Sequence, residues 1–386
     1  MAATHDVPLV DQHCHGVLAR DPEPEEFAGG LTEAAAAGTR DRWHSSLGLA
    51  VRRWCAPVLD LPPHVSPQDY LERRAELGWW EATARLLRAA GVAHWLVDTG
   101  YAPSPNLEPG DVCGAGHEVL RVEQVAETLA PRANSAAALL DGFRDELRAR
   151  AGDVVALKSV VAYRSGLDVP GECPPDGAAA RAAQGWLRSG DARLTDPVLH
   201  AWVVHEAARV GAELELPLQF HTGFGDEDLH LREVDPLLLT DFLRATKDTG
   251  VEVVLLHCWP FHRNAAYLAH VFDHVSVDIG LTLPFVGVRA DDVLAEALEL
   301  APFDSVLYSS DGNVLPELHH LGAVLWRHHF GRLLDSWLAD DVIDVAGAER
   351  LAFDVGAGNA ARLHPRLRSR MGNRLSSPRG RAPRLR

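Results

Sequence analysis

The chain has 386 residues, 47% hydrophobic and 24% charged, and a formal net charge of −17 at pH 7. This length fits one α/β barrel with an insertion or two ordinary domains, and the acidity argues against specific nucleic-acid binding. No apolar stretch reaches the about 18 residues of a membrane span, and the start lacks the regions of a signal peptide. Five scattered cysteines without a Cys-x-x-Cys pair suit a reducing compartment, so we expect a cytoplasmic protein.

Short apolar runs alternate with helical stretches along the chain. The runs predict eight strands, near residues 7–13, 92–98, 118–122, 154–161, 216–221, 251–257, 275–279 and 305–311. The stretches between them predict helices over 135–151, 197–211, 236–250, 263–272 and 290–300. This alternation is typical of parallel strands covered by helices. We therefore predict an α/β fold, a (β/α)8 TIM-like barrel whose chemistry lies at the C-terminal strand ends.

We expect the barrel to occupy residues 1–364. Residues 20–90 predict a helical insertion after the first strand, which would be a lid or pocket wall, a packing cap, or an oligomer contact. Exposed apolar faces there would suit a homodimer. The Pro- and Gly-rich residues 166–190 predict a loop over the catalytic face. Residues 365–386, rich in arginine and free of acids, predict a disordered tail that is a solvated end or touches acidic partners or RNA nonspecifically.

Histidines and an aspartate mark the ends of several predicted strands. His13 and His15 close the first strand, and because side chains alternate along a strand, they point to the same face. His221, His257 and Asp311 close the fifth, sixth and eighth strands. Imidazoles and carboxylates bind divalent metals, so these strand ends predict a metal site. The alternative for each residue alone is a packed side chain or a loop position.

Lysine is scarce in this chain. Of 37 basic residues, only Lys158 and Lys247 are lysine. Lys247 has polar neighbours and is predicted at the surface, whereas Lys158 lies inside a predicted buried strand, where an unpaired ammonium is costly. A primary amine can lose its proton or form a carbamate that bridges metals, and a guanidinium can do neither. The alternative is an ion pair with a buried carboxylate.

These residues together resemble a known family. The pattern of strand-end residues resembles that of the amidohydrolase superfamily. It comprises a His-x-His pair after strand one, a lysine in strand four, histidines after strands five and six, and an aspartate after strand eight. Three segments of the chain also resemble the amidohydrolase-related branch of this superfamily. That branch includes the amidohydrolase half of proteins fused to a glutamine-synthetase-like domain. The three segments are residues 158–167 (Lys-Ser-Val-Val-Ala-Tyr-Arg-Ser-Gly-Leu), Ser310–Asp311 and residues 358–363 (Gly-Asn-Ala-Ala-Arg-Leu). The resemblance covers residues 7–364.

The resemblance implies a metal-dependent hydrolase with a divalent cation, for which zinc is the first choice over manganese, iron or nickel. Both histidines of the His-x-His pair and Asp311 would be ligands in every version of the site, with His221 as the fourth. A carbamylated Lys158 would bridge two metals, with His221 and His257 on the second. An unmodified Lys158 implies one metal, with Lys158 and His257 facing the substrate.

The predicted reaction is hydrolysis of a C–N, amide-like bond in a small polar substrate. The metal lowers the pKa of a bound water to about 7, Asp311 moves its proton to the leaving amine, and His257 or the metal polarises the carbonyl. Lys158 completes the predicted catalytic set. Arg164 is a clamp for a substrate carboxylate or a structural salt bridge, and Tyr163 shares its rim. The alternatives are a metal-dependent decarboxylase and a catalytically silent binding or regulatory protein.

Overall fold

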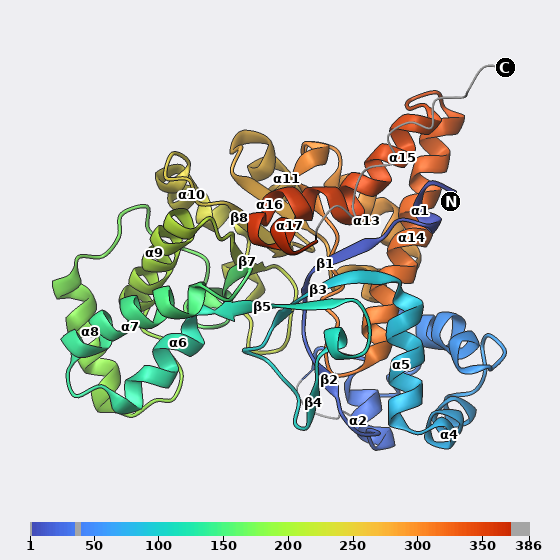
Figure 1. Cartoon of the computed structure of the whole chain (residues 1–386), viewed down its shortest axis with the longest axis horizontal. Coiled ribbons are helices and arrows are strands. Elements are labelled where there is room, and N and C mark those ends of the chain that lie inside the picture. The colour runs from blue at the N-terminus through green and yellow to red at the C-terminus, as the bar shows by residue number, and fades with distance from the viewer. Residues whose placement is uncertain (1, 35–39, 372–386) are drawn as a thin grey trace.

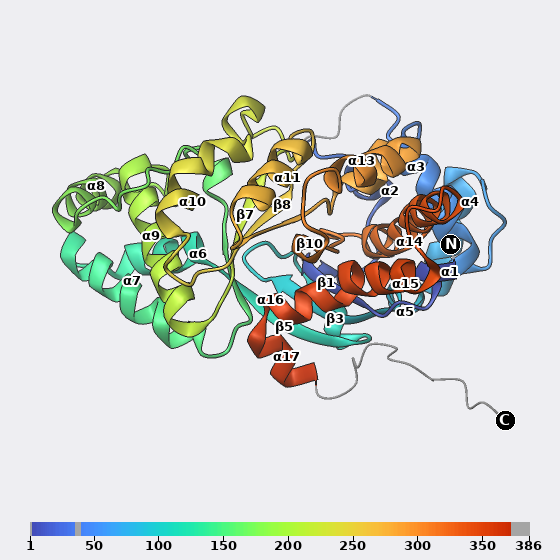
Figure 2. The same ribbon diagram turned by 90° about the horizontal axis from the view of Figure 1, so that it is seen from above.

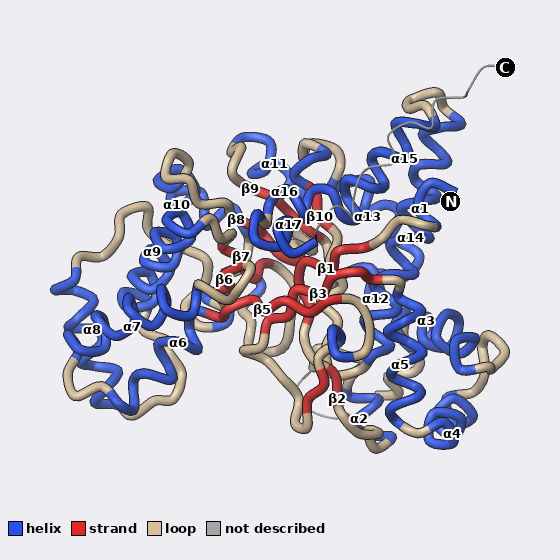
Figure 3. Tube along the Cα trace, viewed as in Figure 1, coloured by secondary structure: helices blue, strands red, loops and turns tan. Residues whose placement is uncertain are grey.

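The computed structural model describes residues 2–34 and 40–371. Eight parallel strands gather at its centre and curl into a nearly closed barrel with helices around it (Figure 3). Neighbouring strands follow one another in chain order from the first to the last. They are β1 Leu9–Cys14, β3 Val92–Asp98, β5 Ala115–Arg121, β6 Ala156–Ser159, β7 Leu218–Thr222, β8 Val253–His257, β9 Val275–Asp278 and β10 Val306–Leu307. The predicted barrel is confirmed, and each strand overlaps its predicted range.

Burial explains why the chain forms parallel strands. Every residue of β1, β6, β7, β8 and β9 is buried, because one face of each strand points into the barrel and the other packs under helices. Strands covered on both faces are characteristic of parallel sheets. A small antiparallel pair, β2 Val17–Leu18 with β4 Asn106–Leu107, lies outside the barrel and was not predicted.

The barrel closes between its first strand and the segment that follows its last. The Gln12 N–H donates to the Tyr308 carbonyl at 3.2 Å, and the Asp311 N–H donates to the His13 carbonyl at 3.1 Å. The Asp11 carboxylate also accepts hydrogen bonds from the Ser310 backbone N–H and hydroxyl. These contacts fix the segment that carries Asp311 beside the segment that carries His13.

Helices surround much of the barrel, as two perpendicular views show (Figures 1 and 2). No described helix combines the length and the hydrophobicity that crossing a bilayer requires. The helices are α1 Ala2–His5, α2 Pro24–Gly29, α3 Ser46–Ala50, α4 Pro67–Leu77, α5 Trp79–Ala90, α6 Val122–Leu129, α7 Ala136–Ala151, α8 Asp176–Ser189, α9 Pro197–Leu214, α10 Thr240–Thr246, α11 His262–Val271, α12 Thr282–Val286, α13 Ala290–Ala297, α14 Pro316–Ala339, α15 Val345–Phe353, α16 Asn359–Leu363 and α17 Pro365–Met371.

The predicted loop over residues 166–190 is wrong in its second half, which forms α8. Its buried residues Ala179, Ala183 and Trp186 recur at a helical spacing and lie on one face, so the segment packs against α7 and α9. The glycines that suggested a loop occupy positions where a helix tolerates them, and Gly190 ends α8 in the left-handed conformation.

The C-terminal segment also folds further than predicted. Disorder from residue 365 onward is wrong for α17, Pro365–Met371, whereas residues 372–386 lie outside the described residues. Leu367 and Met371, four positions apart, belong to an apolar cluster that includes Val10 of β1 and Ala156 of β6. The disorder prediction rested on the high arginine content of this segment and overlooked its short apolar face.

The insertion after β1 is helical, as predicted, and a buried ion pair fixes it to the barrel. Arg74 of α4 donates through Nε to Glu317 Oε1 at 2.7 Å, and the Tyr70 hydroxyl donates to the same oxygen at 2.8 Å. The side chain of Arg74 is 4% exposed and that of Glu317 is fully buried. Glu317 lies in the first turn of α14, so this contact joins the insertion to a barrel helix.

Arg74→Ala should lower the free energy of unfolding by about 3–5 kcal/mol, because it leaves the Glu317 carboxylate buried without its cation. Urea denaturation followed by circular dichroism measures the change. Arg244→Ala, which breaks the exposed pair with Asp241, is the matched control and should cost about 0–1 kcal/mol. Equal effects of the two substitutions would contradict the anchoring role of Arg74.

Candidate functional site

Two histidines and an aspartate converge at the C-terminal end of the barrel. His13 lies in β1, His15 follows it, and Asp311 follows β10. The Nε2 atoms of His13 and His15 lie 3.4 and 3.5 Å from Asp311 Oδ1. Among the described residues, these three side chains form a buried group whose ligand atoms lie within 4.8 Å of one another. The predicted proximity of residues about three hundred positions apart is therefore observed.

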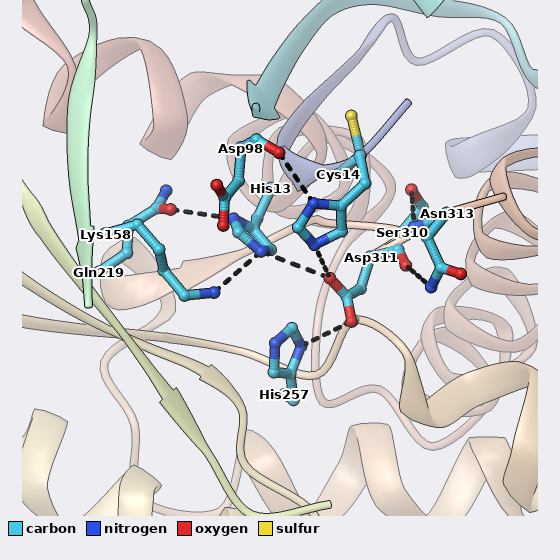
Figure 4. Close-up of polar contacts among 12 residues, drawn as sticks. His13, Cys14, Asp98, Lys158, Gln219, His257, Ser310, Asp311 and Asn313 are labelled. Carbon is cyan, nitrogen blue, oxygen red and sulfur yellow. Dashed lines mark hydrogen bonds and ion pairs between the residues drawn. The ribbon is translucent and has the colours of Figure 1, made fainter. Parts of the chain in front are cut away.

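The tautomer of His13 follows from its hydrogen bonds (Figure 4). Gln219 Nε2 donates to the Gln12 carbonyl at 2.9 Å, which makes Gln219 Oε1 an acceptor. His13 Nδ1 lies 3.0 Å from that oxygen and must therefore carry the proton. Its Nε2 presents a lone pair toward Asp311. Burial, together with Lys158, also holds the pKa of His13 well below its ordinary value, so the ring is neutral.

His15 is oriented in the same way. Its Nδ1 lies 3.0 Å from the backbone carbonyl of Asp98, which can only accept, so Nδ1 donates, and in the neutral ring Nε2 carries the lone pair. The Asp98 carboxylate accepts from Arg121 at 2.7 Å. Burial alone would raise the pKa of Asp98, but Arg121 and the other nearby cations bring it to about 2.

In their neutral forms, both Nε2 atoms thus direct lone pairs toward the region of Asp311 Oδ1, and the Lys158 amine contacts His13 Nε2 from one side at 3.0 Å. Burial would raise the pKa of Asp311, but His257, His15 and Lys158 offset this effect, so its pKa is lowered and the carboxylate is ionised. Two ligands of a tetrahedral ion with bonds of about 2.0–2.1 Å lie about 3.3 Å apart, close to the separations of Asp311 Oδ1 from His13 and His15. Mutual repulsion of these atoms would be relieved by a cation, so the donor set fits a divalent metal.

His257 and His221 lie beside this group. His257 Nδ1 is 3.6 Å from Asp311 Oδ2, and the His221 and His257 ring centroids are 4.6 Å apart. Neither His257 Nδ1 nor His221 Nε2 has a hydrogen-bond partner among the described residues, although both atoms are buried. Burial lowers the pKa of both histidines, which leaves neutral rings with nitrogen atoms free for a metal or a substrate.

Backbone strain accompanies two of these residues. His257 has φ of 67° and Asp311 has φ of 49°, a left-handed backbone conformation that residues other than glycine seldom adopt. Asp278 Oδ1 accepts a hydrogen bond from the His257 N–H at 2.8 Å and thereby holds the strand end in place. Such strain is concentrated at functional sites, where it costs about 1–3 kcal/mol per residue.

Lys158 lies within the group, as the sequence predicted, with a side chain that is almost fully buried. Its Nζ donates to His13 Nε2 at 3.0 Å. Burial lowers the pKa of Lys158 to about 8, although Asp98 and Asp311 favour the protonated form. The amine is therefore poised to exchange a proton near neutral pH, and the alternative of a close ion pair with one carboxylate is not observed.

Tyr163 and Arg164 lie on the same rim. The Tyr163 ring is 4.5 Å, centroid to centroid, from His221. A Cβ atom at Gly225 would lie 2.2 Å from the Tyr163 hydroxyl, so a larger residue there would displace the Tyr163 side chain. Arg164 is 3.8 Å from Glu127 Oε1, and its Nε has no hydrogen-bond partner among the described residues. Its salt bridge is thus long, and part of the guanidinium remains available.

These residues open into one cavity of about 650 Å³. His15, Lys158, Tyr163, Arg164, His221, His257 and Asp311 line it from the barrel side. Glu33 and its neighbours line it from the insertion, which therefore forms a wall of the cavity as one of the sequence-based alternatives proposed. The volume is suited to a small molecule.

The amidohydrolase family model matches residues 60–366, most of the chain. The chain belongs to the amidohydrolase family. A curated relative, protein fluG of Emericella nidulans, is 32% identical over 225 residues, which cover 55% of this chain and 25% of that protein. The chain therefore spans about a quarter of the length of that relative.

Solved structures of similar proteins extend over nearly the whole amidohydrolase chain. A Lactobacillus casei protein designated a metal-dependent hydrolase is 28% identical, with a TM-score of 0.83 over 95% of this chain and 97% of that one. The uronate isomerase of Thermotoga maritima is 16% identical, with a TM-score of 0.63 over 94% and 96% of the two chains. The uronate isomerase likeness is one of fold.

Several residues that shape this amidohydrolase site were not singled out from the sequence. Gln219 fixes His13, and Asp98 and Asp278 fix His15 and His257. A signal for each exists. Gln219 precedes His221 by two residues on one strand, so both face the barrel interior. Asp98 ends its predicted strand, and Asp278 is the penultimate residue of the predicted strand 275–279. Glu33 has no such signal, because it lies in an irregular part of the insertion.

Proposed function

We propose that this amidohydrolase cleaves a C–N, amide-like bond in a small polar substrate that bears a carboxylate. The observation that carries the proposal is the convergence of two oriented Nε2 atoms and a buried carboxylate at one point. Family membership and the likeness to the Lactobacillus casei protein support metal-dependent hydrolysis as the reaction class.

We propose zinc as the metal and one ion per chain. Neutral imidazole and carboxylate are ligands that zinc prefers, and His13, His15 and Asp311 would hold it. An unmodified Lys158 favours a single ion, because a free amine cannot bridge two metals as a carbamate does, and its contact with His13 Nε2 would give way when the ion binds. A divalent cation at this point would supply Lewis acidity, which lowers the pKa of water to about 7 at such centres.

The chain's own residues would carry the proton transfers. Asp311 is ionised, and we assign it the role of accepting a proton from the attacking water and delivering it to the leaving nitrogen. His257, whose Nδ1 faces Asp311 Oδ2, would donate to or orient the carbonyl oxygen of the scissile bond. Lys158 would stabilise negative charge that develops beside His13.

The rim would bind the rest of the substrate. Arg164 has an unpartnered Nε and lines the cavity, so its guanidinium would accommodate a substrate carboxylate. Tyr163 would position the substrate against His221, because its ring packs on that imidazole. Removal of water from this cavity would strengthen each of these interactions.

Metal content and metal removal test the proposal. Protein purified without added metal should contain one divalent ion per chain, and a chelator should abolish hydrolysis of N-acyl amino acids, with zinc restoring it. Amine release from a panel of such compounds measures activity. Two ions per chain would contradict the single-ion arrangement, and release of carbon dioxide in place of amine would favour a decarboxylase. An active enzyme without metal would contradict the proposal altogether.

Gln219→Leu should weaken metal binding by about 10–100-fold, because loss of the Oε1 acceptor frees His13 to adopt the other tautomer. Zinc affinity measured by competition with a chromophoric chelator checks this result. Thr246→Val removes a buried hydroxyl away from the site and serves as the control. Unchanged zinc affinity in Gln219→Leu would show that the Gln219 contact does not orient His13.

A further inference from the structure

Glu33 brings a carboxylate from the insertion into the catalytic cavity. It lines the cavity together with Asp311, Arg164 and Asp226. Among the described residues it has neither a hydrogen-bond nor an ion-pair partner, although its side chain is mostly buried. Burying a carboxylate without a partner costs free energy, and a ligand that pairs with the carboxylate removes this cost.

The surroundings of Glu33 make the missing partner a cation. Burial, with smaller contributions from Asp311 and Asp226, raises the pKa of Glu33 to about 7, and no described group lowers it. Arg121, which lines the same cavity, is paired with Asp98 at 2.7 Å, and Arg193 contacts Asp228 at 3.5 Å. Within residues 2–34 and 40–371, no basic side chain therefore forms an ion pair with Glu33.

The same cavity holds the opposite arrangement at Arg164. Its guanidinium has only a 3.8 Å contact to Glu127, and its Nε is buried without a partner. One wall thus presents a carboxylate without a cation, and another presents a guanidinium without a close anion. A ligand that carries both a positive and a negative charge would form an ion pair with each group at once.

We propose that Glu33 binds a protonated amine of the substrate, so that the substrate is zwitterionic, with its carboxylate at Arg164 and its ammonium group at Glu33. This inference rests on the proposed function and narrows its substrate to an amide derived from an amino acid or diamine. The insertion then confers substrate specificity, since Glu33 belongs to it and not to the barrel.

Binding of simple probes tests the proposal without catalysis. Isothermal titration of the zinc-loaded enzyme is carried out with ω-aminoalkanoates of two to six carbons and with unsubstituted alkanoates of the same lengths. At the length that spans the two groups, the aminoalkanoate should bind at least tenfold more tightly than its matched alkanoate. Equal affinities at every length would overturn the proposal.

Variants assign the preference to Glu33. Glu33→Gln should abolish the preference for the aminoalkanoate while leaving alkanoate affinity within twofold, and Arg164→Gln should weaken both probes. Glu72→Gln, which removes the same charge from an exposed position of the insertion, should change neither. A preference that survives in Glu33→Gln would show that the amine binds elsewhere, such as the metal, and would overturn the assignment.

Two further readouts separate this inference from the proposed function. Zinc content should be the same in Glu33→Gln and in the wild type, and loss of zinc would show that Glu33 is a metal ligand instead. Amide hydrolysis without amine preference would overturn this inference alone. Amine preference without hydrolysis would overturn the proposed reaction alone.

Discussion

Asp311→Asn should lower kcat at least about 10³-fold while the protein keeps its fold. The substitution preserves the size of the side chain but removes the negative charge and the ability to accept a proton from water. General-base groups contribute about 10²–10⁴-fold to such reactions, and loss of an anionic metal ligand adds to this effect. Steady-state kinetics on the best amide of the panel measure the change, and circular dichroism confirms the fold.

A neighbouring carboxylate supplies the control for Asp311→Asn. Asp304 is exposed and precedes β10, whereas Asp311 follows it. Asp304→Asn should leave kcat within twofold of the wild-type value. Undiminished turnover in Asp311→Asn would rule out the proton-transfer role that we assign to this residue.

Lys158→Met should lower kcat by about 10²-fold or more without loss of metal. Methionine fills a similar volume and removes a buried amine, so the barrel should remain folded. Lys158→Arg should be equally inactive, because a guanidinium stays charged and cannot exchange a proton near neutral pH. Kinetics and metal analysis of both variants measure the two effects, with Lys247→Met at an exposed position as the control.

Metal stoichiometry gives the Lys158 variants their diagnostic value. In the single-ion arrangement, each variant keeps the same zinc content as the wild type. If the wild type holds two ions and each variant holds one, Lys158 bridges metals as a carbamate. That result would contradict the role of a free amine beside His13.

Strand positions and their terminal histidines could be predicted because both signals are local. A buried parallel strand needs a continuous apolar run, and a polar residue that ends the run then lies at the C-terminal edge of the barrel. His221, His257 and Asp311 all follow this rule. Lys158 stood out for a related reason, since a charged residue within such a run is costly to bury.

Features that depend on distant contacts could not be predicted. The sequence places Gln219 on the inner face of its strand, but its contact with His13 depends on β1 and β7 lying opposite each other across the barrel. Glu33 lies in an irregular segment whose path depends on how the insertion packs against α14. The short helix α17 was missed because two apolar residues among arginines are a weak pattern until the barrel supplies a surface for them.

Anomalous diffraction from crystals grown with zinc tests the central claim most directly. Data collected on both sides of the zinc absorption edge should show one strong peak within about 2.0–2.2 Å of His13 Nε2, His15 Nε2 and a carboxylate oxygen of Asp311. Disappearance of this peak in Asp311→Ala would complete the assignment. A strong peak elsewhere, with none among these three residues, would contradict the account.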